Sequence, residues 1–194
     1  MIREALLKRA ERVMASRSPD FEVGPPGDRY MLRWHLCSWS NYEKGSVPKN
    51  RWEAFVRALP AVYVHRFLHD DDDRALHDHP FGSVSIPLKT GYWEVLFVPL
   101  SETRISQLRE QAVFRPTYKT FRKEGSVTIR RAATAHRIVL KREADGSIPE
   151  TVSLFLMGFR IRDWGFYCPK GWKFWKDFVS SRDRGAIGVG CGED

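Results

Sequence analysis

Cysteine is scarce in this chain, and its spacing excludes two common kinds of site. The 194 residues include three cysteines, Cys37, Cys168 and Cys191, and no two of them form a CxxC pair. Such a set is too small and too scattered for a disulfide framework or a structural zinc site. We therefore expect Cys168, which precedes Pro169, to pack as an ordinary apolar side chain, and we expect the reducing cytoplasm as the compartment.

Long apolar runs and a glycine-rich nucleotide motif are also missing. No stretch is apolar over the roughly 20 residues that a membrane helix needs, and residues 1–18 carry charges throughout, unlike a signal peptide. The glycines of residues 185–192 neither follow a predicted strand nor precede a predicted helix, so they do not form a dinucleotide fingerprint. We expect a soluble, intracellular protein without a membrane partner.

Positive charge and aromatic side chains are abundant. The formal charge is +8 with a pI near 9.6, and 13% of the residues are aromatic. This composition favours one folded domain and an anionic partner, with nucleic acid, nucleotides and phosphorylated metabolites as candidates. Several basic residues fall on neighbouring predicted strands, where we interpret them as a solvated outer face and, alternatively, as a phosphate-contact surface. This basic band comprises Arg122, Lys123, Arg130, Arg131, Arg137, Lys141 and Arg142.

The first part of the chain, residues 1–60, reads as a helical extension packed on the rest. Apolar residues at helical spacing predict an amphipathic helix over Ile2–Ala15 and a second, shorter helix over Pro48–Leu59, which Pro60 terminates. Between them, prolines and glycines predict a connector over Ser18–Asp28.

The sequence pattern of residues 61–168, the middle of the chain, predicts an all-β barrel. Short runs rich in β-branched and aromatic residues alternate with turn residues and with no intervening helices, which favours an antiparallel barrel or double-sheet jelly roll. Residues 169–194 are predicted to form an aromatic C-terminal cap, for core or interface packing, and a mobile tail. The predicted strands are Tyr63–Leu68, Ala75–His79, Ser83–Leu88, Tyr92–Pro99, Thr120–Arg122, Ser126–Arg130, His136–Leu140 and Thr151–Arg160.

Three histidines stand out in this region as candidate metal ligands. His77 and His79 are two residues apart in a predicted strand, and successive side chains of a strand point to opposite faces. Their imidazoles therefore share a face and can bind one ion. His136, at the start of a later strand, is a candidate third ligand.

These positions resemble the two sequence motifs of the cupin superfamily. The first motif, HxH followed by a strand and a closing glycine, is matched by His77, His79 and Gly91; the second, a glycine followed at a fixed distance by histidine, is matched by Gly125 and His136. The wider pattern is similar to that of uncharacterised cupin-like proteins often carried by phages and prophages. The resemblance covers the middle third of the chain and implies a cupin barrel, often dimeric.

The chain departs from the cupin pattern in two places. Arg131 and Ala133 stand where the second motif usually has proline and glycine, and Ser83 and Val84 stand where four-ligand cupins carry a glutamate. The resemblance therefore points to cupins that bind metal through three histidines alone, as some thiol dioxygenases do. Such a centre keeps coordination positions open for water, substrate or oxygen.

The implied activity is that of a metal-dependent enzyme, an Fe(II) dioxygenase-type oxidoreductase acting on a small, anionic molecule. Imidazole ligands suit Fe(II), and also zinc, nickel and copper. Two carboxylates are candidates for a fourth ligand: Glu94 on the next strand, and Asp78, which a regular strand would point away from its histidine neighbours. Arg66, Tyr92 and Arg160 are candidates for orienting the substrate.

Three other functions remain open from the sequence. His69, Asp71 and His136 would supply the two-histidine, one-carboxylate site of a 2-oxoglutarate-dependent oxygenase, with Arg137 or Arg160 on the cosubstrate. The barrel could instead be a non-catalytic module that binds a nucleotide, a sugar or nucleic acid. A metal-free isomerase or epimerase would use a histidine as general base.

Overall fold

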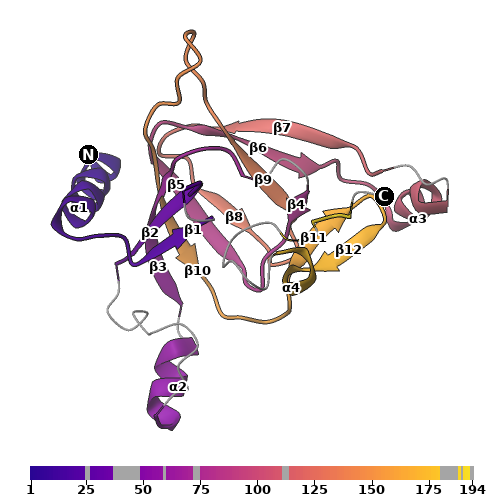
Figure 1. The fold of residues 1–194 in the computed structure, drawn as a ribbon, viewed down its shortest axis with the longest axis horizontal. Coiled ribbons are helices and arrows are strands. Elements are labelled where there is room, and N and C mark those ends of the chain that lie inside the picture. Colours follow the sequence, from indigo (N-terminus) through magenta and orange to yellow (C-terminus); the bar gives the residue numbers. More distant parts are fainter. Residues whose placement is uncertain are drawn as a thin grey trace.

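The described part of the chain forms two antiparallel sheets of six strands each (Figure 1), where the sequence predicted an antiparallel fold of about eight strands. In this computed structural model the described residues are 1–24, 27–36, 49–58, 60–71, 75–110, 114–179, 188 and 190–192. Cys37 and most of the predicted tail, residues 185–194, lie outside them. The architecture confirms the predicted all-β jelly roll with peripheral helices.

The first sheet, called sheet A, has the strand order β1-β2-β3-β10-β5-β8. All of its pairings are antiparallel, and its centre is the long β3–β10–β5 ladder. Its strands are β1 (Phe21–Val23), β2 (Met31–His35), β3 (Ala61–Phe67), β10 (Thr151–Met157), β5 (Ser83–Lys89) and β8 (Thr128–Arg130).

The second sheet, called sheet B, has the order β12-β11-β4-β9-β6-β7 and is also antiparallel throughout. Strand β4 is short, yet it joins the C-terminal hairpin β11–β12 to the long strands β9 and β6. Its strands are β12 (Gly171–Phe174), β11 (Gly165–Cys168), β4 (Leu76–His77), β9 (His136–Leu140), β6 (Tyr92–Phe97) and β7 (Thr117–Arg122).

Four of these strands lie where the sequence analysis expected none. Strands β1 and β2 fall within the predicted helical extension, and β1 lies inside the predicted connector Ser18–Asp28. Both pair into sheet A, so residues 1–60 contribute to the barrel wall as well as to its outside. The β11–β12 hairpin extends sheet B beyond the predicted barrel boundary at residue 168. In each case the strand is short and gains its stability from pairing with a neighbour.

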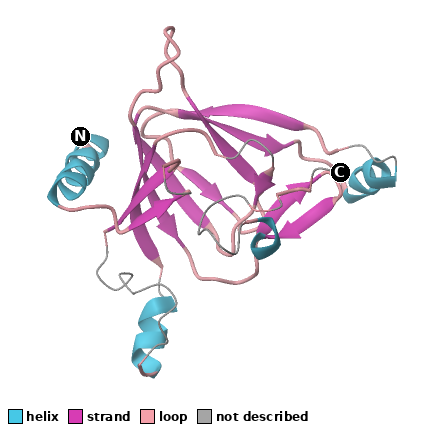
Figure 2. Cartoon of the chain, viewed as in Figure 1, coloured by secondary structure: helices cyan, strands magenta, loops and turns pink. Residues whose placement is uncertain are grey.

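The helices lie outside the two sheets (Figure 2). Helix α1 (Ile2–Ser16) confirms the predicted amphipathic helix, since Ala10 is buried against the outer face of sheet A. Helix α2 (Arg51–Ala58) is shorter than predicted, and its Trp52 and Phe55 are exposed. The remaining helices, α3 (Glu102–Glu110) and α4 (Trp175–Phe178), were not predicted. No helix in the described part of the chain has the length and apolar character needed to cross a membrane.

The turn between β5 and β6 explains the glycine that closes the first motif. Thr90 has a positive φ of 52°, and a Cβ on Gly91 would lie 2.5 Å from the carbonyl oxygen of Arg122 on β7. Only a residue without a side chain permits this close approach of two strands. The glycine thus fixes where β6 begins and which of its side chains face inward.

The aromatic cap packs at the end of the barrel where β4 meets the C-terminal hairpin. Phe166 stacks on Phe178 with ring centroids 3.7 Å apart, and Trp164 stacks on Trp175 at 5.6 Å. This cluster buries Ala75, which lies just ahead of β4. The predicted packing role of the aromatic cluster is therefore confirmed.

A disulfide between Cys168 and Cys191 corrects the prediction of an isolated, packed Cys168. The two residues are 23 apart in sequence, and their Cα atoms lie 5.3 Å apart. That separation is within the range a disulfide spans. The backbone N–H groups of Gly188 and Gly190 both donate to Phe178 O, at the end of α4, which holds the segment that carries Cys191 against the aromatic cap. Because disulfides are rare in a reducing cytosol, the cysteines no longer support the predicted cytoplasmic location.

Removing this crosslink should destabilise the fold. We expect a Cys168→Ser/Cys191→Ser double variant to unfold with a free energy about 3 kcal/mol lower than the wild type, because the crosslink restricts the unfolded chain. Urea unfolding followed by tryptophan fluorescence measures the difference. Adding a reductant should lower the midpoint of the wild type and leave that of the double variant unchanged. Equal midpoints for the oxidised and reduced wild type would contradict the crosslink.

Candidate metal centre

His77 and His136 face each other across neighbouring strands of sheet B. They are directly paired in the antiparallel register of β4 and β9, and residues opposite each other in such a pair project to the same face. Their ring centroids lie 5.3 Å apart. The strand pairing alone therefore brings two imidazoles together on the inner face of the sheet.

His79 joins them because the chain stays extended beyond the end of β4. The backbone N–H of Asp78 donates to Gly165 O, and that of His79 donates to Ala132 O, each over 3.0 Å. These bonds continue the alternation of side chains past the strand end, so His79 projects to the same side as His77. The geometry agrees with the alternation argument made from the sequence.

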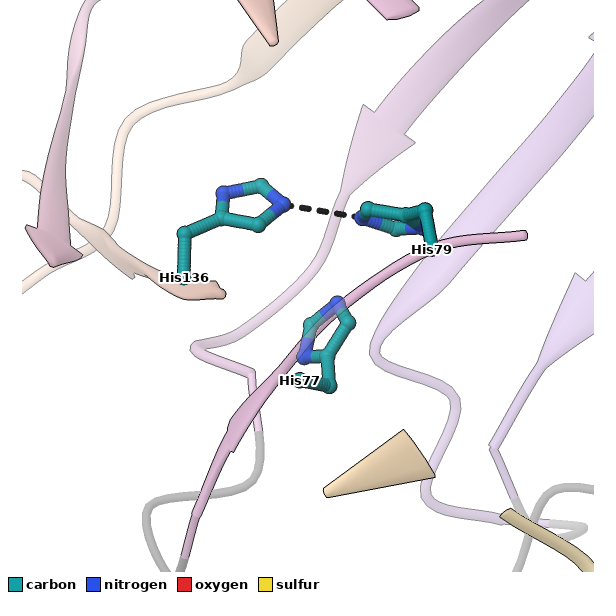
Figure 3. A group of neighbouring side chains, drawn as sticks. All are labelled: His77, His79 and His136. Carbon is teal, nitrogen blue, oxygen red and sulfur yellow. Dashed lines mark hydrogen bonds between the residues drawn. The ribbon is translucent and has the colours of Figure 1, made fainter. Parts of the chain in front are cut away.

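The three imidazoles form one compact cluster (Figure 3). One nitrogen from each ring lies within 4.8 Å of the others, and the Nε2 atoms of His79 and His136 are 2.9 Å apart, joined by a hydrogen bond. In the described part of the chain, no other group of histidine, cysteine, aspartate or glutamate side chains meets this spacing. The cluster has the ligand set and the proximity of a divalent-metal site.

Burial keeps two of these rings neutral. Burial lowers the pKa of His136 to about 4, although the Glu94 carboxylate acts in the opposite direction. Burial, helped by the neighbouring His77 and His136, also lowers the pKa of His79 well below its ordinary value. Neutral imidazole is the form that binds metal. The site therefore presents usable ligands at neutral pH.

Glu94, a candidate fourth ligand, lies behind His136 and outside the cluster. Its carboxylate is fully buried, with Oε1 2.8 Å from His136 Nδ1 and Oε2 2.6 Å from Arg122 Nε. Arg130 Nε also donates to Oε1. Burial alone would raise the pKa of Glu94, but the hydrogen bonds from His136 and Arg130 outweigh it and hold that pKa well below its usual value. The carboxylate is thus charged and fully engaged.

The position of Glu94 tests whether the residues present fit a metal ion. A carboxylate at Nδ1 keeps the proton on that nitrogen, so Nε2 carries a lone pair that faces His79 and accepts its hydrogen bond in this structure. A bound ion would use this lone pair in place of that hydrogen bond. The donor set, the neutral rings and this carboxylate–histidine pair all fit a divalent ion. The residues that would hold it are His77, His79 and His136.

Asp78, the other candidate ligand, points away from the cluster, as strand alternation requires. Its side chain is completely buried. Oδ1 accepts a hydrogen bond from Gly165 N over 2.8 Å, and Oδ2 accepts from Arg162 Nη1 over 2.6 Å and from Trp172 Nε1 over 3.3 Å. Asp78 therefore fastens the HxH segment to the C-terminal hairpin.

A cavity between the two sheets adjoins the cluster. Its volume is about 90 Å³, it is partly open to solvent, and all three histidines line it. Of the three residues predicted to orient the substrate, Tyr92 lines this cavity, and its hydroxyl lies 3.1 Å from Ser85 Oγ. Arg66 and Arg160 do not line it: they pair on the outside with Glu150 and Asp163.

Sequence reasoning missed the charged residues that do line the cavity. Arg33 lies on the unpredicted strand β2, and Arg130 had been assigned to the solvated basic band although it is 95% buried. His65 lies opposite Arg33 on β3. The alternation in Met31–His35 and in Tyr63–Phe67 was the available signal, since inward positions recur every second residue.

The alternative two-histidine, one-carboxylate arrangement does not assemble. Asp71 lines the cavity, where its Oδ2 accepts a hydrogen bond from Ile138 N. His69, however, is 40% exposed and contacts Asp28 over 3.2 Å, away from the cavity. The ligands proposed for a 2-oxoglutarate site are thus not brought together with His136.

The basic band is not one continuous outer face. Arg130 is buried on the inner side and shares Glu94 with Arg122, whereas Lys141 and Arg142 pair with the exposed acids Glu143 and Asp70. The interpretation as a solvated face is wrong for Arg130. Nucleic-acid binding remains a prediction.

Comparison with known proteins gives structural likeness only. No family model and no curated protein matches the sequence. Similar solved structures include an oxalate oxidase in complex with the substrate analogue glycolate (10% identity, TM-score 0.43, covering 75% of this chain and 59% of that one). Others are DMSP lyase DddQ of Ruegeria pomeroyi (14%, 0.41, 77% and 57%) and hydroxypropylphosphonic acid epoxidase of S. wedmorenis (11%, 0.40, 74% and 58%).

The chain spans under 60% of the length of each of these three proteins. All three are enzymes by name, with different reactions, and all three TM-scores lie below 0.5, so we take neither substrate nor reaction from them. The double antiparallel sheet and the three-histidine cluster, both of which the sequence resemblance to cupins implies, are present in the chain itself.

Proposed function

We propose that this protein is a metal-dependent enzyme that binds a divalent ion through His77, His79 and His136 and transforms a small molecule in the adjoining cavity. The observation that carries the proposal is the convergence of three imidazole nitrogens within 4.8 Å of one another at the wall of a cavity. Iron is the first metal to test, because the resemblance to three-histidine cupins implies an Fe(II) dioxygenase-type oxidoreductase. Zinc, nickel and copper suit the same ligands.

The chain's own residues prepare the site for such chemistry. Glu94 holds His136 in one tautomer, and Asp78 holds the HxH segment in place. Phe81 stacks on His79 with ring centroids 5.7 Å apart, which limits access of water to one side of the cluster. A bound divalent ion would polarise substrate or dioxygen at coordination positions that the protein leaves open.

Replacing one ligand should abolish metal binding. We expect the wild type, produced with iron available, to carry about one ion per chain, and His77→Ala to carry none, because two imidazoles bind a divalent ion too weakly to retain it through purification. Elemental analysis for iron, zinc, nickel and copper measures the content. Metal should also raise the melting temperature of the wild type and not that of the variant.

His69→Ala is the matched control for this experiment. His69 is partly exposed, belongs to the alternative ligand set and lies outside the cavity, so its removal should leave the metal content unchanged. Metal-free wild-type protein, or equal metal in the wild type and His77→Ala, would overturn the proposal. Salt-sensitive binding of nucleic acid that persists in His77→Ala would favour the non-catalytic binding module instead.

A further inference from the structure

Arg33 presents an unused guanidinium fork to the cavity. Its Nε donates to His65 Nε2 over 3.0 Å, but its two terminal nitrogens donate to no group in the described part of the chain. No carboxylate of the described residues lies within ion-pair distance of it. Arg33 is half-buried, and a partly desolvated guanidinium without an acid is costly unless an anionic ligand pairs with it.

The surroundings of Arg33 fix its orientation. Arg33 and His65 are directly paired on β2 and β3, so both project to the inner face. The guanidinium carbon lies 4.9 Å from the ring centroid of Tyr63 and 6.0 Å from that of Phe21. His65 accepts the hydrogen bond from Nε, and the two aromatic rings lie beside the guanidinium, so the two terminal nitrogens remain available. These two nitrogens form the side of a guanidinium that can pair with both oxygens of one carboxylate.

The charges around the cavity favour an anion. On the far side from Arg33, Arg130 and Arg122 share the single carboxylate of Glu94. Nη2 of Arg130 is buried and has no hydrogen-bond partner within the described residues. The one acidic side chain in the described lining is Asp71, whose pKa is raised by burial. The lining is therefore net positive even before any metal is bound.

Aromatic and other apolar side chains make up much of the rest of the cavity wall. Phe155 stacks on His65 with ring centroids 4.9 Å apart and also lies near His79, at 6.4 Å. Phe81 stands 6.3 Å from Phe155. These two phenylalanines bridge the space between the Arg33–His65 pair and the histidine cluster. A ligand that spans this distance contacts charge at one end and apolar rings along its length.

We propose that the cavity binds a small monocarboxylate with an apolar body, whose carboxylate pairs with the free fork of Arg33 while its apolar part lies against Phe81 and Phe155. A single planar fork matches a carboxylate better than a phosphate, which offers more oxygens than one arginine can satisfy. That the far end of this molecule is the part transformed beside the histidines rests on the proposed function. The carboxylate contact itself requires no metal.

Matched pairs of simple probes test the carboxylate contact. Calorimetric titrations compare each carboxylate with its neutral isostere: hexanoate with hexanamide, and benzoate with benzamide. Each titration uses the wild-type protein in two forms, one loaded with metal and one stripped of metal with a chelator. Because a hydrogen-bonded ion pair in a partly dry site contributes about 1.5–3 kcal/mol, we expect each carboxylate to bind at least tenfold more tightly than its amide. Hexylphosphonate, added as a third arm, should bind no more tightly than hexanoate.

Two substitutions at Arg33 and one matched control locate the contact. Arg33→Gln should bring the carboxylate-to-amide ratio close to one, and Arg33→Lys, which keeps the charge and loses the fork, should lower it several-fold while preserving the fold. Arg66→Gln removes an arginine from the strand next to β2, on the outer face, where it pairs with Glu150. That variant should keep the wild-type ratio. Circular dichroism and melting temperatures establish that each variant is folded.

The possible outcomes separate this inference from the proposed function. Arg33-dependent carboxylate binding in stripped protein supports the inference even if His77→Ala shows that no metal site exists. Stoichiometric metal together with a ratio that Arg33→Gln leaves unchanged would overturn the inference and retain the metal centre. Absence of saturable binding of either carboxylate, an equal loss in Arg66→Gln, or preference for the phosphonate would likewise overturn it.

Discussion

A Glu94→Gln variant is expected to unfold with a free energy about 3–5 kcal/mol below that of the wild type. Glu94 is fully buried and is the single acid shared by Arg122 and Arg130. Glutamine preserves the shape of the side chain but removes its charge, which leaves Arg130 as an uncompensated cation inside the barrel. Removing one partner of a buried pair costs far more than the pair contributes, because the remaining charge cannot return to water.

The same substitution should weaken metal binding. Glu94 Oε1 lies 2.8 Å from His136 Nδ1, and its negative charge favours the tautomer whose Nε2 faces the cluster. Loss of such an outer carboxylate lowers metal affinity about 10- to 100-fold. Competition with a chromogenic chelator measures this affinity, and urea unfolding of the metal-free protein measures the free energy separately, so the two effects are not confused.

Glu150→Gln provides the control, because Glu150 also meets two cations, Lys89 and Arg66, but is 34% exposed. Exposed pairs contribute about 0–1 kcal/mol, so this variant should stay close to the wild type in stability and equal to it in metal affinity. If both variants lost the same small free energy, Glu94 would not be the charge that balances the barrel interior.

Asp78→Ala should be the second strongly destabilising change, costing about 3 kcal/mol or more. The completely buried carboxylate accepts from Gly165 N, Arg162 and Trp172. Alanine leaves the buried Gly165 N–H without an acceptor and Arg162 without its acid, and each such loss costs about 1–3 kcal/mol. A Cβ on Gly165 would lie 2.0 Å from Lys173 O, so the two strands of the hairpin approach each other closely at this point.

The metal content of the Asp78→Ala variant shows whether Asp78 anchors the HxH segment or binds the metal ion itself. Because the carboxylate faces the hairpin, we expect the folded variant to bind the same number of ions per chain as the wild type, with lower affinity. Asp163→Ala, which removes an exposed acid paired with the exposed Arg160, is the control and should change neither quantity. Complete loss of metal from a folded Asp78→Ala protein would instead identify Asp78 as a ligand.

Local patterns in the sequence were sufficient to predict the inner core of the site. The alternation of His77, Asp78 and His79 predicts two imidazoles on one face and a carboxylate on the other, and that is how they lie. This prediction works because alternation in an extended chain is a purely local property. Where Asp78 finds its partners could not be predicted, since Gly165 and Arg162 lie more than 80 residues away.

Strand β8 shows where the hydrophobic pattern misleads. Val127 and Ile129 would be expected to face the core, yet they are 62% and 78% exposed, while Thr128 and Arg130 are buried. The inversion follows from pairing: Arg130 lies opposite Ser83 on β5 and reaches Glu94 from sheet B. A buried ion pair between two sheets forms only if the strands of both sheets have the right register. A short stretch of sequence does not determine that register.

The short strands and the disulfide were missed for a related reason. Strands β1, β2, β11 and β12 have three to five residues each. Strands β2 and β11 depend on β3 and β4, which come from distant parts of the chain, and among the described strands the edge strands β1 and β12 pair only with β2 and β11. The approach of Cys191 to Cys168 likewise depends on the bonds of Gly188 and Gly190 to Phe178 O, which no local pattern indicates. Arg33, the residue with the free fork, was overlooked with the strand that carries it.

The position of Asp78 between two histidines has a consequence for how the centre can move. The backbone of this segment and the Asp78 side chain both bond to Gly165, and β4 pairs with β11, so His77 and His79 are attached to the hairpin along one short segment. A displacement of the hairpin therefore carries both rings together and preserves the distance between them. His136 stands on the other side of β4, so flexing of the site should appear where the two halves meet. These contacts are the pairing of His77 with His136 and the hydrogen bonds of His79 to His136 and to Ala132 O.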